Sequence, residues 1–99
     1  MERKYKLLSI EKSPRYLKKY VATFVDNDGN IKKTHFGASG YTDYTMSKNR
    51  LQAESYRRRH RKDLETNDPT RAGFLSYYIL WDTPDFHENI RRYKNRFNM

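Results

Sequence analysis

The sequence predicts a single α+β domain, residues 1–99, in which a three-stranded antiparallel meander precedes three helices. The first third of the chain, about residues 3–36, is rich in β-branched and aromatic residues and is interrupted by two turn signals. Residues from about 47 to 97 instead carry apolar side chains at helical spacing. A length of 99 residues is typical of one domain.

The three expected strands follow one another with short connections. The first, Tyr5–Ile10, is separated by the turn signal at residues 13–15 from the second, Tyr20–Val25. A tight turn at Asp26–Asn30 then leads into the third strand, Ile31–Phe36. Alternation places on one face of the second strand the side chains of Tyr20, Ala22 and Phe24.

The turn at residues 26–30 also invites comparison with a calcium-binding loop. That motif needs glycine at its sixth position and glutamate at its twelfth. Here Gly29 is fourth and Gly37 is twelfth, so the sequence favours a hairpin turn.

A glycine- and tyrosine-containing loop, residues 37–46, connects the strands to the helices. Gly37 and Gly40 predict a turn with positive φ, although their backbone N–H groups are also suited to an anion. The loop lacks the Gly-Lys-Ser/Thr ending of a phosphate-binding P-loop. Tyr41 and Tyr44 are suited either to stacking on a nucleobase or to a protein interface.

The helix expected from residue 47 is strongly cationic. Residues 48–62 contain seven Lys or Arg and one Glu. One side carries the modestly apolar series Ala53, Tyr56, His60 and Leu64. The other side, together with the preceding loop, carries the expected polyanion-binding residues Lys48, Arg50, Arg57, Arg58, Arg61, Lys62, Tyr41 and Tyr44. Like charges at this spacing destabilise an isolated helix, and a bound polyanion would remove the penalty; a merely solvated charged face is the alternative.

Two further helices are expected to complete the domain. Ser47 or Thr45 is expected to cap the cationic helix, and an acidic loop containing Asp63, Glu65 and Asp68 to end it. Thr70 is expected to cap a buried helix over 74–81, which packs between the sheet and the two amphipathic helices. Thr83-Pro84 is expected to start the last helix.

The last helix has an apolar stripe and a second basic surface. The stripe consists of Phe86, Ile90, Tyr93 and Phe97. The secondary basic surface consists of Arg91, Arg92, Lys94 and Arg96.

Composition narrows the class of function. The 21 Lys and Arg outnumber the 12 Asp and Glu, and a formal charge of +9 indicates an anionic partner. The chain has no cysteine, so disulfides and thiolate metal sites are excluded. No apolar run reaches the roughly 20 residues of a membrane span, and the charged start is unlike a signal peptide. We therefore expect an intracellular, non-secreted, soluble protein.

The sequence offers one weak candidate set of catalytic residues. His35 ends a strand close to Asp43 and Arg50, a combination able in principle to hydrolyse phosphodiesters. None of the three histidines stands in a metal-ligand motif, so neither a metal nor another cofactor is expected. A phosphodiesterase-type enzyme is thus the third hypothesis.

Several blocks of the sequence together resemble a family of small basic proteins of large nucleocytoplasmic DNA viruses. They are Phe36-Gly37, Gly40–Thr45, Tyr56–His60, Ala72–Ser76, Leu80-Trp81 and Tyr93–Phe97. The resemblance covers most of the chain beyond residue 35 but supplies no activity or catalytic residues. It implies a viral setting, in which the protein would lie in the virion, the host cytoplasm or the nucleus.

The leading hypothesis from the sequence is a non-enzymatic protein that contacts the phosphate backbone of DNA or RNA without sequence preference. It would be a genome- or virion-associated component. The alternative is a minor capsid or cement protein whose basic surfaces meet acidic protein surfaces. The sequence leaves the oligomeric state open.

Overall fold

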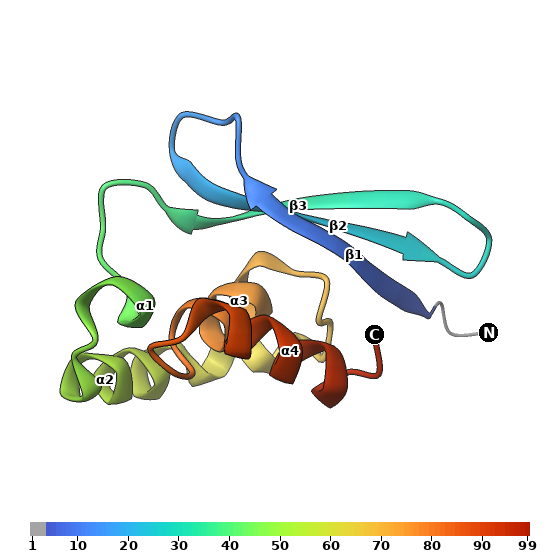
Figure 1. Ribbon diagram of the computed structural model, residues 1–99. Coiled ribbons are helices and arrows are strands. Elements are labelled where there is room, and N and C mark those ends of the chain that lie inside the picture. Colours follow the sequence, from blue (N-terminus) through green and yellow to red (C-terminus); the bar gives the residue numbers. More distant parts are fainter. Residues whose placement is uncertain (1–3) are drawn as a thin grey trace.

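Three antiparallel strands form a meander in the order β1-β2-β3 (Figure 1). The computed structural model describes residues 4–99. The strands are β1 (Tyr5–Lys12), β2 (Lys18–Asp26) and β3 (Ile31–Ala38). The predicted sheet is confirmed, although the expected start near residue 3 lies outside the described residues and β3 continues two residues beyond Phe36.

The turn between β2 and β3 is held by a side chain at its first position. The Asp26 carboxylate accepts hydrogen bonds from the backbone N–H groups of Asp28 and Asn30, both at 2.9 Å. Gly29 takes a φ of +83°, which favours glycine. This confirms the predicted hairpin turn.

One face of the sheet carries the core, and the helices all lie on that side (Figure 1). Ala22, Phe24 and Phe36 are fully buried there. In the register Phe36 lies opposite Tyr20, and Leu7 opposite Phe24, so all three strands contribute to one apolar layer. Within residues 4–99, no helix packs against the face that carries His35 and Val21 (Figure 1).

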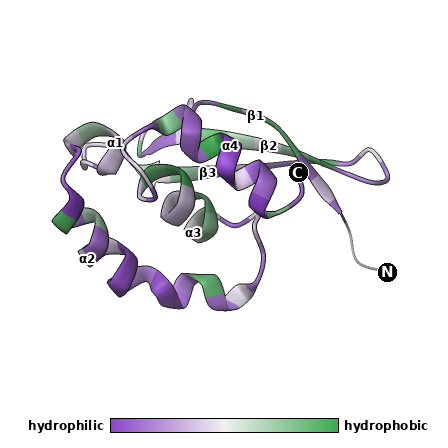
Figure 2. Cartoon of the chain, turned by 60° about the horizontal axis from the view of Figure 1, so that its bottom comes forward, coloured by the Kyte–Doolittle hydropathy of each residue, from purple (hydrophilic) through white to green (hydrophobic). Residues whose placement is uncertain are grey.

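The predicted three helical segments are present, preceded by one short additional helix. The bounds are α1 (Tyr44–Ser47), α2 (Arg50–His60), η1 (Arg61–Thr66), α3 (Ala72–Leu75), η2 (Ser76–Leu80) and α4 (Phe86–Arg96). The expected acidic loop is wrong, because the 3-10 helix η1 continues α2 without a break as far as Thr66. Figure 2 shows the hydrophilic character of α2 and the more hydrophobic character of α3.

The helix-capping residues differ from those expected. Asn49, not Ser47 or Thr45, caps α2 by accepting a hydrogen bond from the N–H of Gln52 at 3.1 Å. The Ser47 hydroxyl instead accepts from the N–H of Asn49. The chain has already formed the separate turn α1 at this point, so the cap falls later.

The start of α4 is shifted in the same way. Asp85, rather than Thr83, caps it by accepting from the N–H of Glu88 at 3.0 Å. Thr83 donates its hydroxyl to Asn89 Oδ1 at 2.6 Å, so this side chain is engaged with the body of α4.

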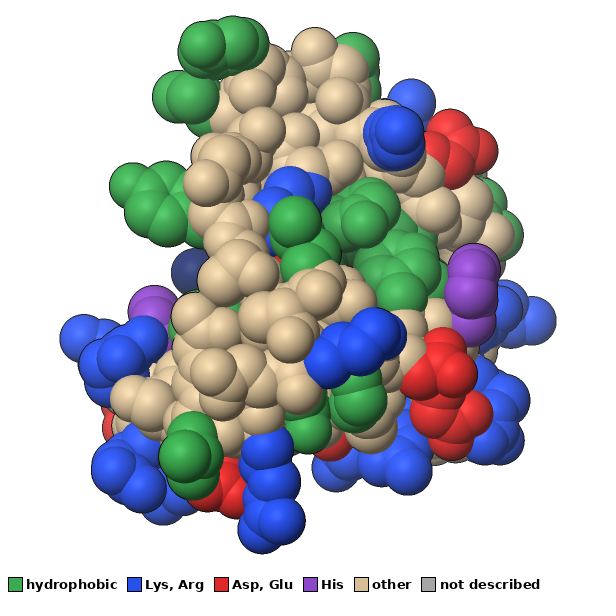
Figure 3. Space-filling model, turned by 60° about the vertical axis from the view of Figure 1, so that its left-hand side comes forward, with side chains coloured by type: hydrophobic (Ala, Val, Ile, Leu, Met, Phe, Trp, Pro, Cys, Tyr) green, Lys and Arg blue, Asp and Glu red, His purple; other side chains and the backbone are tan. Residues whose placement is uncertain are grey.

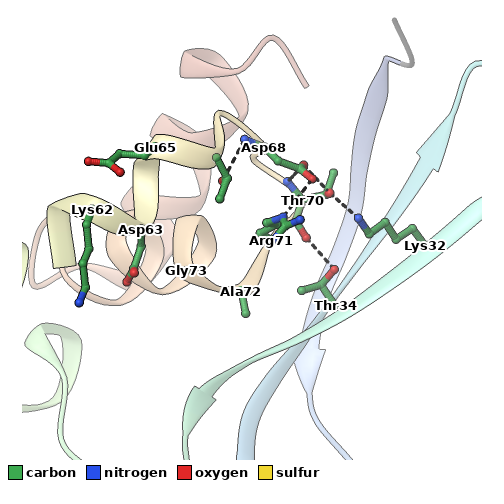
Figure 4. A pocket seen from close by; sticks show the side chains of 11 residues that line it. Lys32, Thr34, Lys62, Asp63, Glu65, Asp68, Thr70, Arg71, Ala72 and Gly73 are labelled. Atoms are coloured by element: carbon green, nitrogen blue, oxygen red, sulfur yellow. Dashed lines mark hydrogen bonds and ion pairs between the residues drawn. The ribbon is translucent and has the colours of Figure 1, made fainter.

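Thr70 connects the helices to the sheet instead of capping α3 (Figure 4). Its hydroxyl and its N–H both donate to Asp68 Oδ1, at 2.6 and 3.0 Å. From β3, Lys32 Nζ donates to the Thr70 hydroxyl and the Thr34 hydroxyl donates to the Thr70 carbonyl, both at 2.7 Å. Thr70 is buried by these contacts, and Arg71 precedes α3 without a capping side-chain bond.

The helical layer packs around α3 and η2. Leu75 and Ile79 are fully buried, and these two segments contact β3 and α4, which confirms the predicted central position. The predicted stripe of α4 also packs on the core. Within the described part of the chain, no helix is both long and apolar enough to cross a bilayer.

Candidate nucleic-acid interface

An exposed group of three cations lies on the continuous α2–η1 segment. Arg58, Arg61 and Lys62 are exposed, and within residues 4–99 none of them forms an ion pair. We call these three residues the cationic strip. Lys and Arg side chains are frequent over the lower part of the molecule in Figure 3, where the helices lie.

The acidic residues that follow the strip in sequence do not neutralise it. Asp63 pairs with His60, with 3.0 Å between Oδ2 and Nδ1, and Asp68 lies 3.6 Å from Arg71. Partial burial acts to raise the pKa of Asp68, but the hydrogen bonds from Thr70, helped by nearby cations, hold that pKa below its ordinary value. Glu65 is exposed and has no ion pair within residues 4–99.

The other expected cations at the start of α2 are compensated in part. Arg50 is exposed and pairs with Glu54, with 3.0 Å between Nε and Oε1. Lys48 Nζ donates to the carbonyl oxygen of Pro84 at 3.5 Å. Both remain accessible to a ligand, but neither side chain is without a partner.

Arg57 is directed into the protein, contrary to the expectation that it lies on the solvent face. It is half-buried, and its guanidinium donates a hydrogen bond to the carbonyl oxygen of Trp81. Arg57 stands one helical turn after the buried Ala53 and so shares its face. That spacing is a signal in the sequence from which the inward position could be inferred.

Replacing Arg57 with glutamine is expected to lower the free energy of unfolding by about 1.5–3 kcal/mol, the usual contribution of a hydrogen bond to a charged group. Chemical denaturation would measure the loss. Arg58→Gln is the matched control, because the neighbouring side chain is exposed and is expected to change stability by less than about 0.5 kcal/mol. Equal effects of the two substitutions would contradict the inward role of Arg57.

The apolar side of α2 ends in a stack of three rings. Tyr56 lies between Trp81 and His60, with centroid distances of 4.2 and 4.0 Å and interplanar angles of 8° and 18°. Burial, with a contribution from Asp63, raises the pKa of the Tyr56 hydroxyl to about 12, so it is neutral at physiological pH. The predicted placement of Ala53, Tyr56 and His60 on one side of the helix is confirmed, but the sequence did not show that Trp81 completes the stack.

The two loop tyrosines have different environments. Tyr41 is 72% exposed, and in the described part of the chain it pairs with no other ring. Tyr44 is half-buried and packs against the core. The two nearby glycines have φ values of +81° and +86°, as predicted. Of these two tyrosines, Tyr41 therefore offers the more open ring to a ligand.

Two of the four cations predicted for the basic surface of α4 are paired with acidic groups. Hydrogen bonds from Arg91 and Arg92 hold the pKa of Glu88 below its ordinary value, and Arg92 also lies 3.7 Å from Asp82. Arg96 lies over the ring of Tyr78, at 4.6 Å from its centroid. Of the four predicted residues, Lys94 is the one without a salt bridge or cation–π contact within residues 4–99.

His35, Asp43 and Arg50 are engaged by three different partners. His35 Nδ1 lies 2.7 Å from the Ser13 hydroxyl, on the sheet face without helices. Asp43 is buried against Lys19 at 2.6 Å, and Arg50 pairs with Glu54. Across residues 4–99, no group of three or more His, Cys, Asp or Glu side chains is arranged to hold a metal ion.

Fold and charge together define a small basic α+β domain with an exposed cationic helix. The chain belongs to a family of unknown function, DUF5754, whose model matches residues 8–60, more than half of its length. The matched segment runs from β1 to the end of α2. No curated protein and no solved structure matches the chain.

Proposed function

We propose that the protein binds nucleic acid through its phosphate backbone, without catalysis, as a component associated with a viral genome or virion. The observation that supports this most directly is the cationic strip, whose three side chains have no carboxylate partner within residues 4–99. Arg61 and Lys62 stand three and four residues after Arg58, so all three lie close together on the helix surface. A row of phosphates would offset their mutual repulsion and accept bidentate bonds from the arginines.

Contacts of this kind carry no sequence information. Guanidinium and ammonium groups recognise phosphates by charge and geometry, whereas sequence is read at base edges. The proposed partner is therefore DNA or RNA of any sequence, and its affinity should fall steeply with salt.

Substitution of the strip by glutamine tests this proposal. The variant Arg58→Gln, Arg61→Gln, Lys62→Gln is expected to reduce the slope of log affinity against log salt by up to about 2.7 for duplex DNA, because each of the three lost phosphate contacts contributes about 0.9. Fluorescence anisotropy with a generic labelled duplex, between about 50 and 200 mM salt, measures the slope.

A second triple variant with the same change in net charge serves as the control. Arg91→Gln, Arg92→Gln, Lys94→Gln removes cations of α4, two of which are already paired with carboxylates, so a smaller change in slope is expected. Absence of binding at low salt would refute the proposal. Equal slopes for the two variants would show that net charge, not the strip, determines the affinity.

A minor capsid or cement protein is the second candidate. Tyr16 and Leu17, at the turn between β1 and β2, are 91% and 67% exposed, as expected of residues that a protein partner covers. Co-purification from the native source with and without nuclease distinguishes the two: a partner retained after nuclease treatment supports the capsid role.

A further inference from the structure

A pocket of about 410 Å³ lies beside α2, bounded by the loop between β3 and α1 and by η2. This volume is within the range of roughly 300–1,000 Å³ that is usual for small-molecule sites. Its lining includes Tyr41, Tyr56, Arg59, Leu80 and Trp81. Gly37 allows β3 to approach η2 closely at the wall of this pocket, since a Cβ at this position would lie 3.0 Å from Leu80 Cδ1.

Charge in this pocket favours an anion. Lys19 and Asp43 both line it, but they neutralise each other across 2.6 Å, and His60 is paired with Asp63. Arg59 is exposed and bonds only the Ser55 hydroxyl, at 3.1 Å, with no carboxylate partner within residues 4–99. The pocket therefore contains one uncompensated guanidinium, a group that binds phosphate.

The rings of this pocket favour a planar ligand. Both faces of Tyr56 are covered, by Trp81 and His60, and Trp81 is only 7% exposed. Tyr41, at 72% exposure, is the most exposed of the lining rings. Bases stack on such rings irrespective of their identity.

A second hollow shares the lining residues Lys19, Tyr41 and Thr42 with this pocket. It has a volume of about 590 Å³ and is lined by Lys12 and Lys18 as well as by Tyr41. A strand whose base stacks on Tyr41 would thus find cations in both hollows, Arg59 in the first and Lys12 and Lys18 in the second, which are positions for successive phosphates.

We propose that this pocket holds one nucleotide unit, with its base stacked on Tyr41 and its phosphate bound by Arg59. The unit is either a free nucleotide or an unstacked nucleotide of a single strand; bases inside a duplex are not accessible in this way. For single strands, this proposal rests on the proposed function and makes it more specific. It predicts that the protein binds single-stranded nucleic acid in preference to duplex.

Two readouts test the pocket independently of the cationic strip. Trp81 is the one tryptophan of the chain and lines the pocket, so its fluorescence reports occupancy by thymidine 5′-monophosphate, with thymidine as the phosphate-free comparison. Anisotropy of labelled oligothymidylate and of a duplex of equal length measures the preference for single strands. The variants are Tyr41→Ala, Arg59→Gln and the control Tyr16→Ala, which removes a tyrosine that lines neither hollow.

We expect Tyr41→Ala to weaken oligothymidylate binding by roughly 5- to 100-fold, the effect of losing one stacked base, with little change for duplex or in Tyr16→Ala. Arg59→Gln should abolish the advantage of thymidine monophosphate over thymidine.

Other outcomes separate the two proposals. Oligonucleotide binding that leaves Trp81 emission unchanged and responds equally to Tyr41→Ala and Tyr16→Ala would overturn the pocket but keep the proposed function. Conversely, a Tyr41-dependent response to thymidine monophosphate without binding of either oligonucleotide would keep the pocket for free nucleotides and overturn the proposed function. Equal losses for single strand and duplex in Tyr41→Ala would overturn the pocket.

Discussion

Replacing Asn89 with aspartate is expected to lower the free energy of unfolding by about 3–5 kcal/mol near neutral pH, an effect typical of a broken buried polar network. Asn89 is fully buried on α4. Its Nδ2 donates to the carbonyl oxygens of Ile79 and Thr83, at 2.8 and 2.9 Å, and its Oδ1 accepts from the N–H and hydroxyl of Thr83. Aspartate has the same shape, but its second oxygen would face two carbonyl oxygens and leave them without donors.

The pH dependence distinguishes this explanation from a packing defect. Burial and the facing carbonyls raise the pKa of the new carboxyl above its unfolded value. A raised folded pKa favours the protonated form, so the deficit of the variant should shrink as pH falls towards the unfolded pKa of about 4 and grow as pH rises. Denaturation of Asn89→Asp and of the exposed turn variant Asn27→Asp over this range measures it. A deficit independent of pH would contradict the explanation.

The parts of the fold that depend on local periodicity were predictable from the sequence. Alternation along β2 identified the core face of the sheet, since Ala22 and Phe24 are fully buried, and helical spacing identified the stripe of α4. In both cases the pattern directly states which side chains face the same way. The packing of the helices on one sheet face then follows.

The true caps of α3 and α4 were not predictable, because the threonines expected to cap them have other partners. Thr83 is bonded to Asn89, in the middle of α4. Thr70 is bonded to Asp68 and to Thr34 of β3. A threonine before an apolar run has the same local sequence whether it caps a helix or joins two elements. Only the three-dimensional packing decides between these roles.

The candidate site was predictable as a cluster of charge but not residue by residue. Arg57 and Arg58 are neighbours of the same type, yet a rotation of about 100° per residue turns the first towards Trp81 and the second towards solvent. Arg59 was not among the expected site residues, although it stands three residues after Tyr56 and therefore on the side that faces the pocket. Which arginine points inward depends on how the helix is rotated about its axis. Ala53 is the one buried residue of α2, and a single small side chain defines that rotation weakly.

Replacing Asp43 with asparagine is expected to cost about 3 kcal/mol of stability, at the lower end of the range for a broken buried ion pair. Asp43 is 2% exposed and accepts from Lys19 Nζ at 2.6 Å; Lys19 itself keeps 13% exposure, which moderates the loss. The asparagine still caps α1, because its oxygen can accept the bond from the N–H of Thr45. The measured loss therefore reports the unpaired ammonium group, whereas Asp43→Ala should cost about 1 kcal/mol more for the lost cap.

A double-mutant cycle with Lys19→Met completes the test, because the methionine removes the stranded charge. The double variant is expected to recover most of the stability lost in Asp43→Asn. The coupling energy from the cycle measures the interaction free energy between Lys19 and Asp43. The double variant also shows whether Lys19 in the pocket only neutralises Asp43 or binds the phosphate itself. If Lys19 only neutralises Asp43, the double variant keeps the response of Trp81 to thymidine monophosphate, because Arg59 still binds the phosphate. Loss of that response in a folded double variant would instead make Lys19 the phosphate-binding cation and contradict the assignment of that role to Arg59.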